Sequence, residues 1–149
     1  MNDKIKFFSA ITRIVVGIVL VYSGYLKIIE PFEVFYDAIL SYKVVGKTIA
    51  YFSALFIPWF ELYLGTFLIL GLFERYAIIT AFGLFSFFEI LLLQAIIRKL
   101  EITSCGCFGA KHSNPIGVEF LLNIVWILFL YVSYRFRSNT SIDRWIEKR

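Results

Sequence analysis

The sequence has 149 residues, of which 60% are hydrophobic and 19% aromatic, and its mean hydropathy is +0.78. This composition excludes a soluble globular domain, which needs far less apolar surface. The formal net charge of +4 gives no reason to expect nucleic-acid binding, because most of the excess lies in the C-terminal tail, where anionic lipid headgroups are the natural partners.

Four long apolar runs follow one another along the chain, at approximately residues 7–26, 49–73, 76–97 and 117–134. Each is close to the roughly 17–25 residues that a helix needs to cross the bilayer core. We therefore expect an all-α membrane protein, a four-transmembrane-helix bundle that forms a single integral membrane domain over residues 1–149. The first run follows two lysines as a secretory signal would, but no cleavage pattern comes after it, so we expect it to be retained.

The first span carries Arg13, Gly17, Leu20, Gly24 and Lys27 at spacings of three and four residues, which places all five on one stripe of a helix. Glycines let a neighbouring helix approach closely, and cations are too costly to point into lipid. This stripe is therefore expected to face protein.

A short segment follows, starting at Pro31, which suits the first turn of a new helix. Apolar residues recur with helical spacing from Phe32 to Leu40, with polar residues elsewhere around the wheel. This pattern predicts a short amphipathic interfacial helix between the first and second spans. An ordered loop packed on the bundle is the alternative.

The second span has Pro58, Glu61 and Gly65 on one face, with Glu61 about midway along it. A carboxylate at that depth costs several kcal/mol unless it is paired or protonated, and Arg13 is the best candidate partner. A buried ion pair that only fixes helix packing is the alternative interpretation. The turn to the third span is expected at residues 73–76.

The third span carries a second midplane acid, Glu89, and has Gln94 nearer its outer end, while the fourth span contributes Glu119 and Asn123. We expect Gln94 and Asn123 to lie at similar depth, where they form a polar patch. Such a patch is suited to binding the head group of a quinone or to passing protons. Hydrogen bonding between helices is the alternative role, and it is the usual one for amides in membrane bundles.

Orientation follows from the positive-inside rule. Nine of the 15 Lys and Arg residues fall on the side of the two termini and six on the opposite side. Both termini are therefore expected to be cytoplasmic, in a bacterial inner (plasma) membrane, with the loop between the third and fourth spans on the periplasmic side. That compartment is one in which disulfides form and exchange.

This loop holds both cysteines and the single histidine of the chain. Cys105 and Cys107 are separated by one glycine, so a disulfide between them would close a small, strained ring that exchanges easily. Lys111 and His112 lie close in sequence and are candidates for stabilising a thiolate. Two alternatives stay open. Cys105, Cys107 and His112 offer three ligands for Cu(I) or zinc, and the cysteines also suit an inert structural role.

An ordered set of residues resembles the MauE branch of the DoxX-like membrane proteins. The set consists of Arg13 with Gly17, Ser23-Gly24 followed by Lys27, Pro58 with Glu61 and Gly65, Gly71, and the segment Cys105-Gly106-Cys107-Phe108-Gly109. The resemblance implies a four-helix membrane protein of thiol–disulfide chemistry. Its named member works in methylamine utilisation beside a thioredoxin-like protein, maturing the disulfide-rich small subunit of methylamine dehydrogenase. Relatives accompany thioredoxin-like proteins without any methylamine pathway, and the DoxX side includes subunits of quinone-linked oxidoreductases.

By this resemblance Cys105 and Cys107 are the redox pair, and Arg13, Lys27 and Glu61 form a shared intramembrane polar set. The function that we predict is a membrane thiol–disulfide oxidoreductase. It would exchange electrons with a periplasmic thioredoxin-like partner, and with a quinone as a further candidate partner, in the maturation of exported proteins. The alternatives are a non-catalytic membrane anchor for a redox partner and a small transporter that uses Arg13, Glu61 and Glu89.

Overall fold

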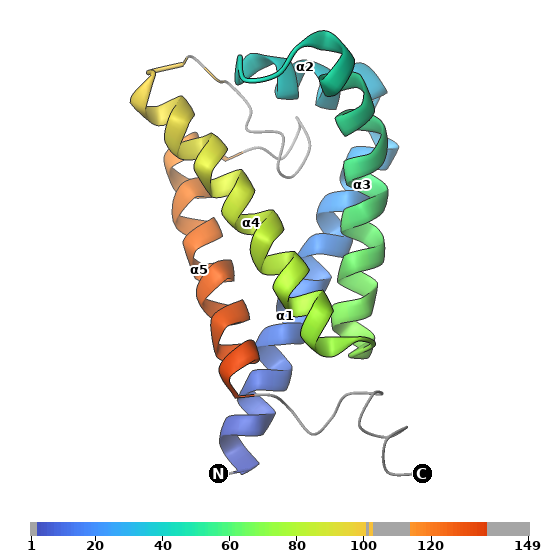
Figure 1. Ribbon diagram of the computed structural model, residues 1–149, viewed down its shortest axis with the longest axis vertical. Helices are drawn as coiled ribbons and strands as arrows, with labels where there is room; N and C mark the ends of the chain where they lie inside the picture. The colour runs from blue at the N-terminus through green and yellow to red at the C-terminus, as the bar shows by residue number, and fades with distance from the viewer. Residues whose placement is uncertain (1–2, 101, 103–113, 137–149) are drawn as a thin grey trace.

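A computed structural model describes residues 3–100, 102 and 114–136 of the chain. The described residues form five helices and no strand (Figure 1). The helices are α1 (Asp3–Ile29), α2 (Phe32–Ser41), α3 (Lys47–Leu70), α4 (Glu74–Ile97) and α5 (Ile116–Arg135). The all-α prediction is confirmed.

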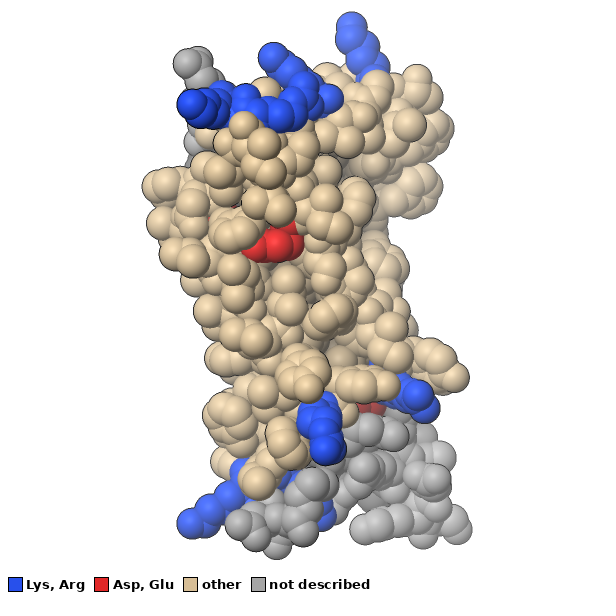
Figure 2. Space-filling view, turned by 60° about the vertical axis from the view of Figure 1, so that its left-hand side comes forward, with Lys and Arg blue, Asp and Glu red and all other residues tan. Residues whose placement is uncertain are grey.

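Four of these helices are long and apolar enough to cross a membrane, over Lys4–Ile29, Lys47–Leu70, Glu74–Ile97 and Ile116–Arg135. They agree with the four predicted spans. Figure 2 shows the corresponding surface, in which Lys and Arg side chains gather at the two ends and an almost uncharged band lies between them. An apolar band with charged ends is what a bilayer requires of a spanning bundle.

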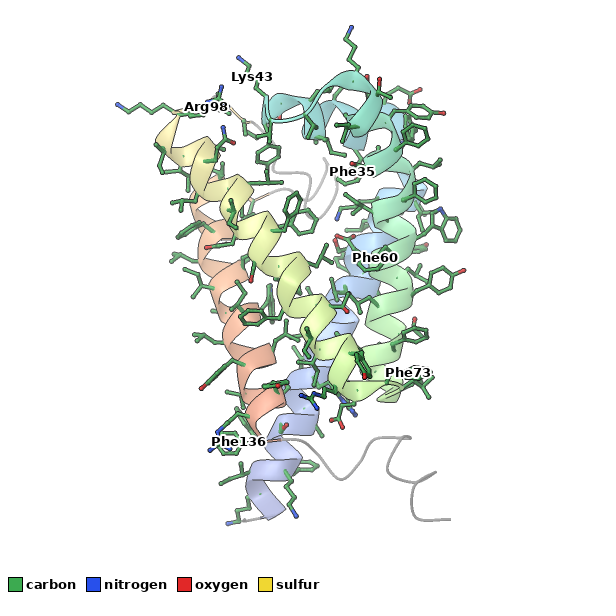
Figure 3. The ribbon with its side chains drawn as sticks, viewed as in Figure 1. Phe35, Lys43, Phe60, Phe73, Arg98 and Phe136 are labelled. Atoms are coloured by element: carbon green, nitrogen blue, oxygen red, sulfur yellow. The ribbon has the colours of Figure 1, made fainter. Side chains whose placement is uncertain are left out.

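The long helices alternate in direction, and α2 lies across one end of the bundle (Figure 1). We call this end, where α1 finishes and α5 begins, the loop end. The opposite end, where α1 begins and α5 finishes, is called the terminal end. The helix predicted between the first and second spans is thus present as α2. One of its residues, Phe35, is buried, and it points into the bundle between α3 and α4 (Figure 3).

Helices α1 and α3 approach each other closely because glycine lies at their contact. A Cβ atom on Gly24 would be 2.6 Å from the Pro58 carbonyl oxygen, and one on Gly17 would be 2.8 Å from the Gly65 carbonyl oxygen. Only hydrogen fits in such a space, so these positions require glycine. The predicted close approach along the α1 stripe is confirmed.

The turn between α3 and α4 lies earlier than the predicted residues 73–76. Helix α3 ends at Leu70 and is capped by Gly71, which has a left-handed φ of 69° and whose N–H donates to the Phe67 carbonyl at 2.8 Å. Glycine takes this conformation without a steric penalty and commonly ends helices in this way. Phe73 also has a left-handed φ, of 47°, and α4 begins directly after it. Glu74 therefore belongs to the first turn of α4.

Two apolar clusters fill the bundle. The larger one joins α1, α3, α4 and α5 around Leu20, Leu68 and Ile78. The smaller one lies at the loop end and centres on Tyr42 and Leu92. Ile102 and Ile116 pack against this smaller cluster, so the chain is fixed to the bundle on both sides of residues 103–113.

Candidate functional site

The predicted redox and metal residues, Cys105, Cys107, Lys111 and His112, lie outside the described residues. Among the residues that are described, no group of three or more His, Cys, Asp and Glu is arranged to hold a metal ion. The candidate site is therefore built here from the charged and polar side chains that the helices bury between them.

Lys27, Glu61 and Ser23 form a closed triad between α1 and α3. The Lys27 ammonium donates to both Glu61 carboxylate oxygens at 2.7 Å and to Ser23 Oγ at 3.0 Å, and Ser23 Oγ donates to Glu61 Oε2 at 3.1 Å. The Lys27 and Glu61 side chains are only 1% and 2% exposed. Three donor bonds saturate an ammonium group, so Lys27 has no N–H left for a ligand.

The close approach of the two helices brings this triad together. Ser23 and Lys27 are one turn apart on α1, and Gly24 lies between them against α3. Because Gly24 has no side chain, the backbone of Pro58 and the Cβ atom of Glu61 lie close to it. A Cβ atom added to Gly24 would be 3.3 Å from the Glu61 Cβ. Since the two backbones are so close, Lys27 can bind both oxygens of Glu61 while its ammonium group stays inside the protein.

The predicted partnership of Arg13 with Glu61 is wrong. Arg13 Nη1 lies 3.2 Å from Glu74 Oε1, and both side chains are almost fully buried. Helices α1 and α3 run in opposite directions and face each other at Gly17 with Gly65, so Arg13 comes near the end of α3 and reaches the start of α4. Glu61 lies towards the other end of α1, where Lys27 is its neighbour.

A cluster of hydroxyl groups lies near Arg13 at the terminal end. Thr12 Oγ1 and Ser133 Oγ are 2.8 Å apart, and Ser133 Oγ donates to the Ser9 carbonyl oxygen at 3.2 Å. All three residues are buried and together they connect α1 to α5. This cluster is a packing device, because each hydroxyl is satisfied inside it.

The two amides that were expected at one depth have different partners. Gln94 lies beside Arg98 near the loop end of α4, and the amide orientation that satisfies both groups lets its oxygen accept from Arg98 Nη1 at 2.6 Å. Asn123 instead lies deeper in the bundle, with its amide beside the Glu89 carboxylate. Asn123 is only 5% exposed. Helix direction explains the difference, since α4 and α5 are antiparallel and Asn123 is two turns into α5.

Glu119 is a further buried acid whose role the sequence did not reveal. It is 1% exposed and accepts a hydrogen bond from Asn114 Nδ2 at 2.7 Å. Lys27 also exerts an electrostatic attraction on its carboxylate. The position of Glu119 in the first turn of the last span is the sequence feature that could have revealed this role. An acid there interacts favourably with the helix dipole and can bind the chain that precedes the helix.

Two cavities meet at Lys27. The outer pocket has a volume of about 80 Å³ and lies under α2, with a mostly apolar lining that includes Phe35, Ile57 and Phe88. The inner cavity has a volume of about 20 Å³ and lies inside the bundle. The Lys27 ammonium lies 5.0 Å from the centre of the Phe35 ring and 5.6 Å from that of Phe88, distances at which cations are attracted to aromatic faces. Lys27 therefore stands between the two spaces.

Comparison with known proteins agrees with this architecture. The family model described as "Methylamine utilisation protein MauE" matches residues 5–135, which include all four spans and the loop between the third and fourth. The comparisons with curated proteins and with solved structures give no match. A match over most of the chain, together with four membrane-spanning helices, shows that the protein belongs to the MauE family, which is associated with methylamine utilisation.

Proposed function

We propose that this protein is a membrane component of thiol–disulfide chemistry, in which Cys105 and Cys107 exchange a disulfide with a thioredoxin-like protein. The observation that carries the proposal is the Cys-Gly-Cys sequence in a loop whose two flanks, at Ile102 and Ile116, pack into one apolar cluster of the bundle. Both flanks lie at the loop end of the bundle, and we propose that the segment between them meets a second protein there.

The exchange needs no other oxidant than the partner's disulfide. A thiolate of the pair attacks one sulfur of that disulfide, the partner's S–S bond breaks, and a mixed disulfide forms while the partner's other sulfur leaves as a thiolate. The second cysteine of the pair then attacks the mixed disulfide. Cys105 and Cys107 end as a disulfide, the partner ends as a dithiol, and the two protons lost by the pair are taken up by the partner's sulfurs. The reverse sequence reduces the pair.

Lys111 and His112 are proposed to favour the thiolate that starts this exchange. A positive charge close to a cysteine lowers the pKa of its thiol, and the thiolate is the attacking species. We further propose that the termini are cytoplasmic and that the loop faces the periplasm of a bacterial inner membrane, where such exchange takes place. Quinone binding at Gln94 and Asn123 stays a prediction, and the transporter alternative is not favoured, because Lys27 closes off Glu61.

Differential alkylation in native membranes tests the proposal. With a membrane-impermeant reagent, both cysteines should be labelled from outside after reduction and protected after mild oxidation. Single variants Cys105→Ser and Cys107→Ser should trap a mixed disulfide with the partner, which reduction releases. Cysteines that stay modifiable under every oxidising condition, or labelling only from the cytoplasmic side, would contradict the proposal. The double variant Cys105→Ser/Cys107→Ser is the control.

A second candidate function is a non-catalytic anchor that stabilises a redox partner. It is favoured by the two ion pairs, Lys27–Glu61 and Arg13–Glu74, in which a buried cation lies against a buried anion, as a purely structural bundle requires. Replacing both cysteines separates the two candidates. An anchor would keep its partner's abundance and activity unchanged in the double variant, whereas an exchange protein would lose the trapped species and change the ratio of the partner's dithiol and disulfide forms.

A further inference from the structure

The inner cavity gathers polar groups from three helices. Ser23 and Lys27 of α1, Glu61 of α3 and Asn123 of α5 line it, and Phe85 and Phe88 of α4 close its side. A space of about 20 Å³ exceeds the roughly 10–15 Å³ that one water molecule occupies. Size and lining both suit a single water.

The lining of this cavity contains a donor that needs a partner. Asn123 Nδ2 is buried, and among the described residues no group accepts a hydrogen bond from it with good geometry. Both oxygens of the neighbouring Glu89 carboxylate are in the same condition. Buried amides and carboxylates are nearly always hydrogen-bonded to protein or to ordered water. Asn123 therefore lies between the Glu89 carboxylate of α4 and the Ser23–Lys27–Glu61 triad, where a further hydrogen-bonding group would connect the two.

A count of acceptors shows where a water would bind. Among the described residues, Glu61 Oε2 accepts hydrogen bonds from both Lys27 and Ser23, whereas Oε1 accepts one, from Lys27. A carboxylate oxygen has room for about two hydrogen bonds. Oε1 is thus the acceptor with capacity on the triad side, and Asn123 Nδ2 is the donor on the α5 side.

We propose that the inner cavity is a water-binding site, and that its water accepts a hydrogen bond from Asn123 and donates one to Glu61. The bound water, with Asn123, joins Glu89 to the Ser23–Lys27–Glu61 triad. The charge or protonation of Glu89 is then felt at Glu61 through a hydrogen-bonded path rather than through lipid or apolar side chains. This inference goes beyond the proposed thiol chemistry and does not depend on the cysteines.

The proposed connection has a chemical consequence for both acids. An ionised Glu89 accepts from the Asn123 amide N–H₂, whereas a protonated Glu89 can donate to the amide oxygen after the amide turns over, which changes the N–H group that is available to the water. The water responds by changing its hydrogen bonds, and with them the strength of the bond to Glu61. The titratable groups around the cavity are Lys27 on α1, Glu61 on α3, Glu89 on α4 and Glu119 on α5.

Infrared difference spectroscopy of the full-length protein in lipid nanodiscs tests the water site. Exchange into water labelled with the heavy oxygen isotope should shift one sharp O–H band of a strongly hydrogen-bonded internal water. Asn123→Leu, which keeps the side-chain volume but removes the amide, should abolish that band. Thr12→Val is the matched control, because it removes a buried hydroxyl at the terminal end and should leave the band unchanged.

The absence of an isotope-sensitive band from the wild-type protein, or its persistence in Asn123→Leu, would overturn the proposal. If Asn123→Leu fails to fold, Ser23→Ala replaces it, because loss of the bond to Oε2 should move the same water band. The band should also survive in Cys105→Ser/Cys107→Ser, so failure of the thiol proposal and failure of the water site are distinguished.

The coupling between the acids is tested by a double-mutant cycle on the Glu61 carboxylate band, which Ser23→Ala identifies by shifting it. Glu89→Gln, which mimics a protonated acid, should shift the Glu61 band in the wild-type background and leave it unmoved in the Asn123→Leu background. An equal shift in both backgrounds, or none in either, would show that Glu89 does not act through Asn123 and the water.

Discussion

The two buried ion pairs of the bundle combine the same kinds of charge but are built differently. Lys27 chelates both oxygens of Glu61 at 2.7 Å, with Ser23 as a third partner and two aromatic rings around the ammonium. Arg13 meets Glu74 at 3.2 Å, beside the turn between α3 and α4. Only the first pair lines the cavities described above.

The two pairs therefore have different surroundings. Arg13–Glu74 is packed between helices, whereas Lys27–Glu61 lies beside cavities. A buried ion pair by itself is weak evidence for function, because desolvation offsets much of its attraction. Arg13–Glu74 ties the first span to the beginning of α4 and needs no further role. Lys27–Glu61 borders two cavities, of about 80 Å³ and about 20 Å³, while both of its side chains stay buried.

The largest expected effect is on the Lys27–Glu61 pair. Lys27→Met should destabilise the bundle by about 3–5 kcal/mol, because it leaves the Glu61 carboxylate buried without its cation. The double variant Lys27→Met/Glu61→Leu should recover most of that loss, since neither charge remains. Unfolding of the purified protein in mixed micelles measures both. A single variant as stable as the wild type would mean that Glu61 finds another partner or water.

Close packing of α1 on α3 is the next effect in size. Gly24→Ala should cost about 1–3 kcal/mol, because the new Cβ would meet the Pro58 backbone and push the triad apart. The same substitution at Gly83 is the matched control. A Cβ there meets no atom within 4 Å, so the greater helix propensity of alanine should leave stability unchanged or raise it by up to about 1 kcal/mol. Equal losses at both positions would contradict the close-contact explanation.

A double-mutant cycle tests the partner of Arg13. The loss caused by Arg13→Met should be smaller in a Glu74→Gln background, with a coupling of about 0.5–3 kcal/mol, because the two side chains are in contact. The Glu61→Gln background should show no such coupling. Thermal unfolding of the single and double variants gives both numbers, and coupling to Glu61 alone would restore the partnership first expected from the sequence.

The smallest expected effect concerns Ser23. Ser23→Ala removes one hydrogen bond to Glu61 and one acceptor for Lys27, and should cost about 0.5–1.5 kcal/mol, at the lower end if the cavity water takes the place of the hydroxyl. Thr66→Ala is the control, since within the described part of the chain its hydroxyl bonds to the Leu62 carbonyl of its own helix and to no other group. A loss at Ser23 no larger than that at Thr66 would mean that the triad does not depend on its third member.

Much of the fold was predictable because it depends on periodicity and length. The four spans, the short helix after Pro31 and the buried stripe from Arg13 to Lys27 all follow from where apolar, glycine and charged residues recur. Family membership was also predictable, since it depends on an ordered set of motifs spread over nearly the whole chain.

Partner choice was harder because it depends on the register between helices. The predicted turn at residues 73–76 lies about two residues too late and leaves Glu74 outside a helix. Glu74 was therefore not considered as the partner of Arg13. The contact of Gly17 with Gly65 would have corrected this, since it sets which turns of α1 and α3 lie at one depth. The predicted depth of Asn123 is wrong for the same reason. Counting residues from the end of α5 does not include the shift of α5 relative to α4 along the bundle axis.

Pairing opposite charges inside the bundle also has an electrical consequence. Lys27–Glu61 and Arg13–Glu74 each join one cation to one anion over a few ångströms, so each moves almost no net charge if the bundle shifts within the membrane field. A full charge crossing the field gains about 2.3 kcal/mol per 100 mV, whereas a neutral pair gains next to nothing. Any response of the described helices to transmembrane voltage would therefore come chiefly from Glu89 and Glu119, the acids inside the spans for which the described residues show no salt bridge.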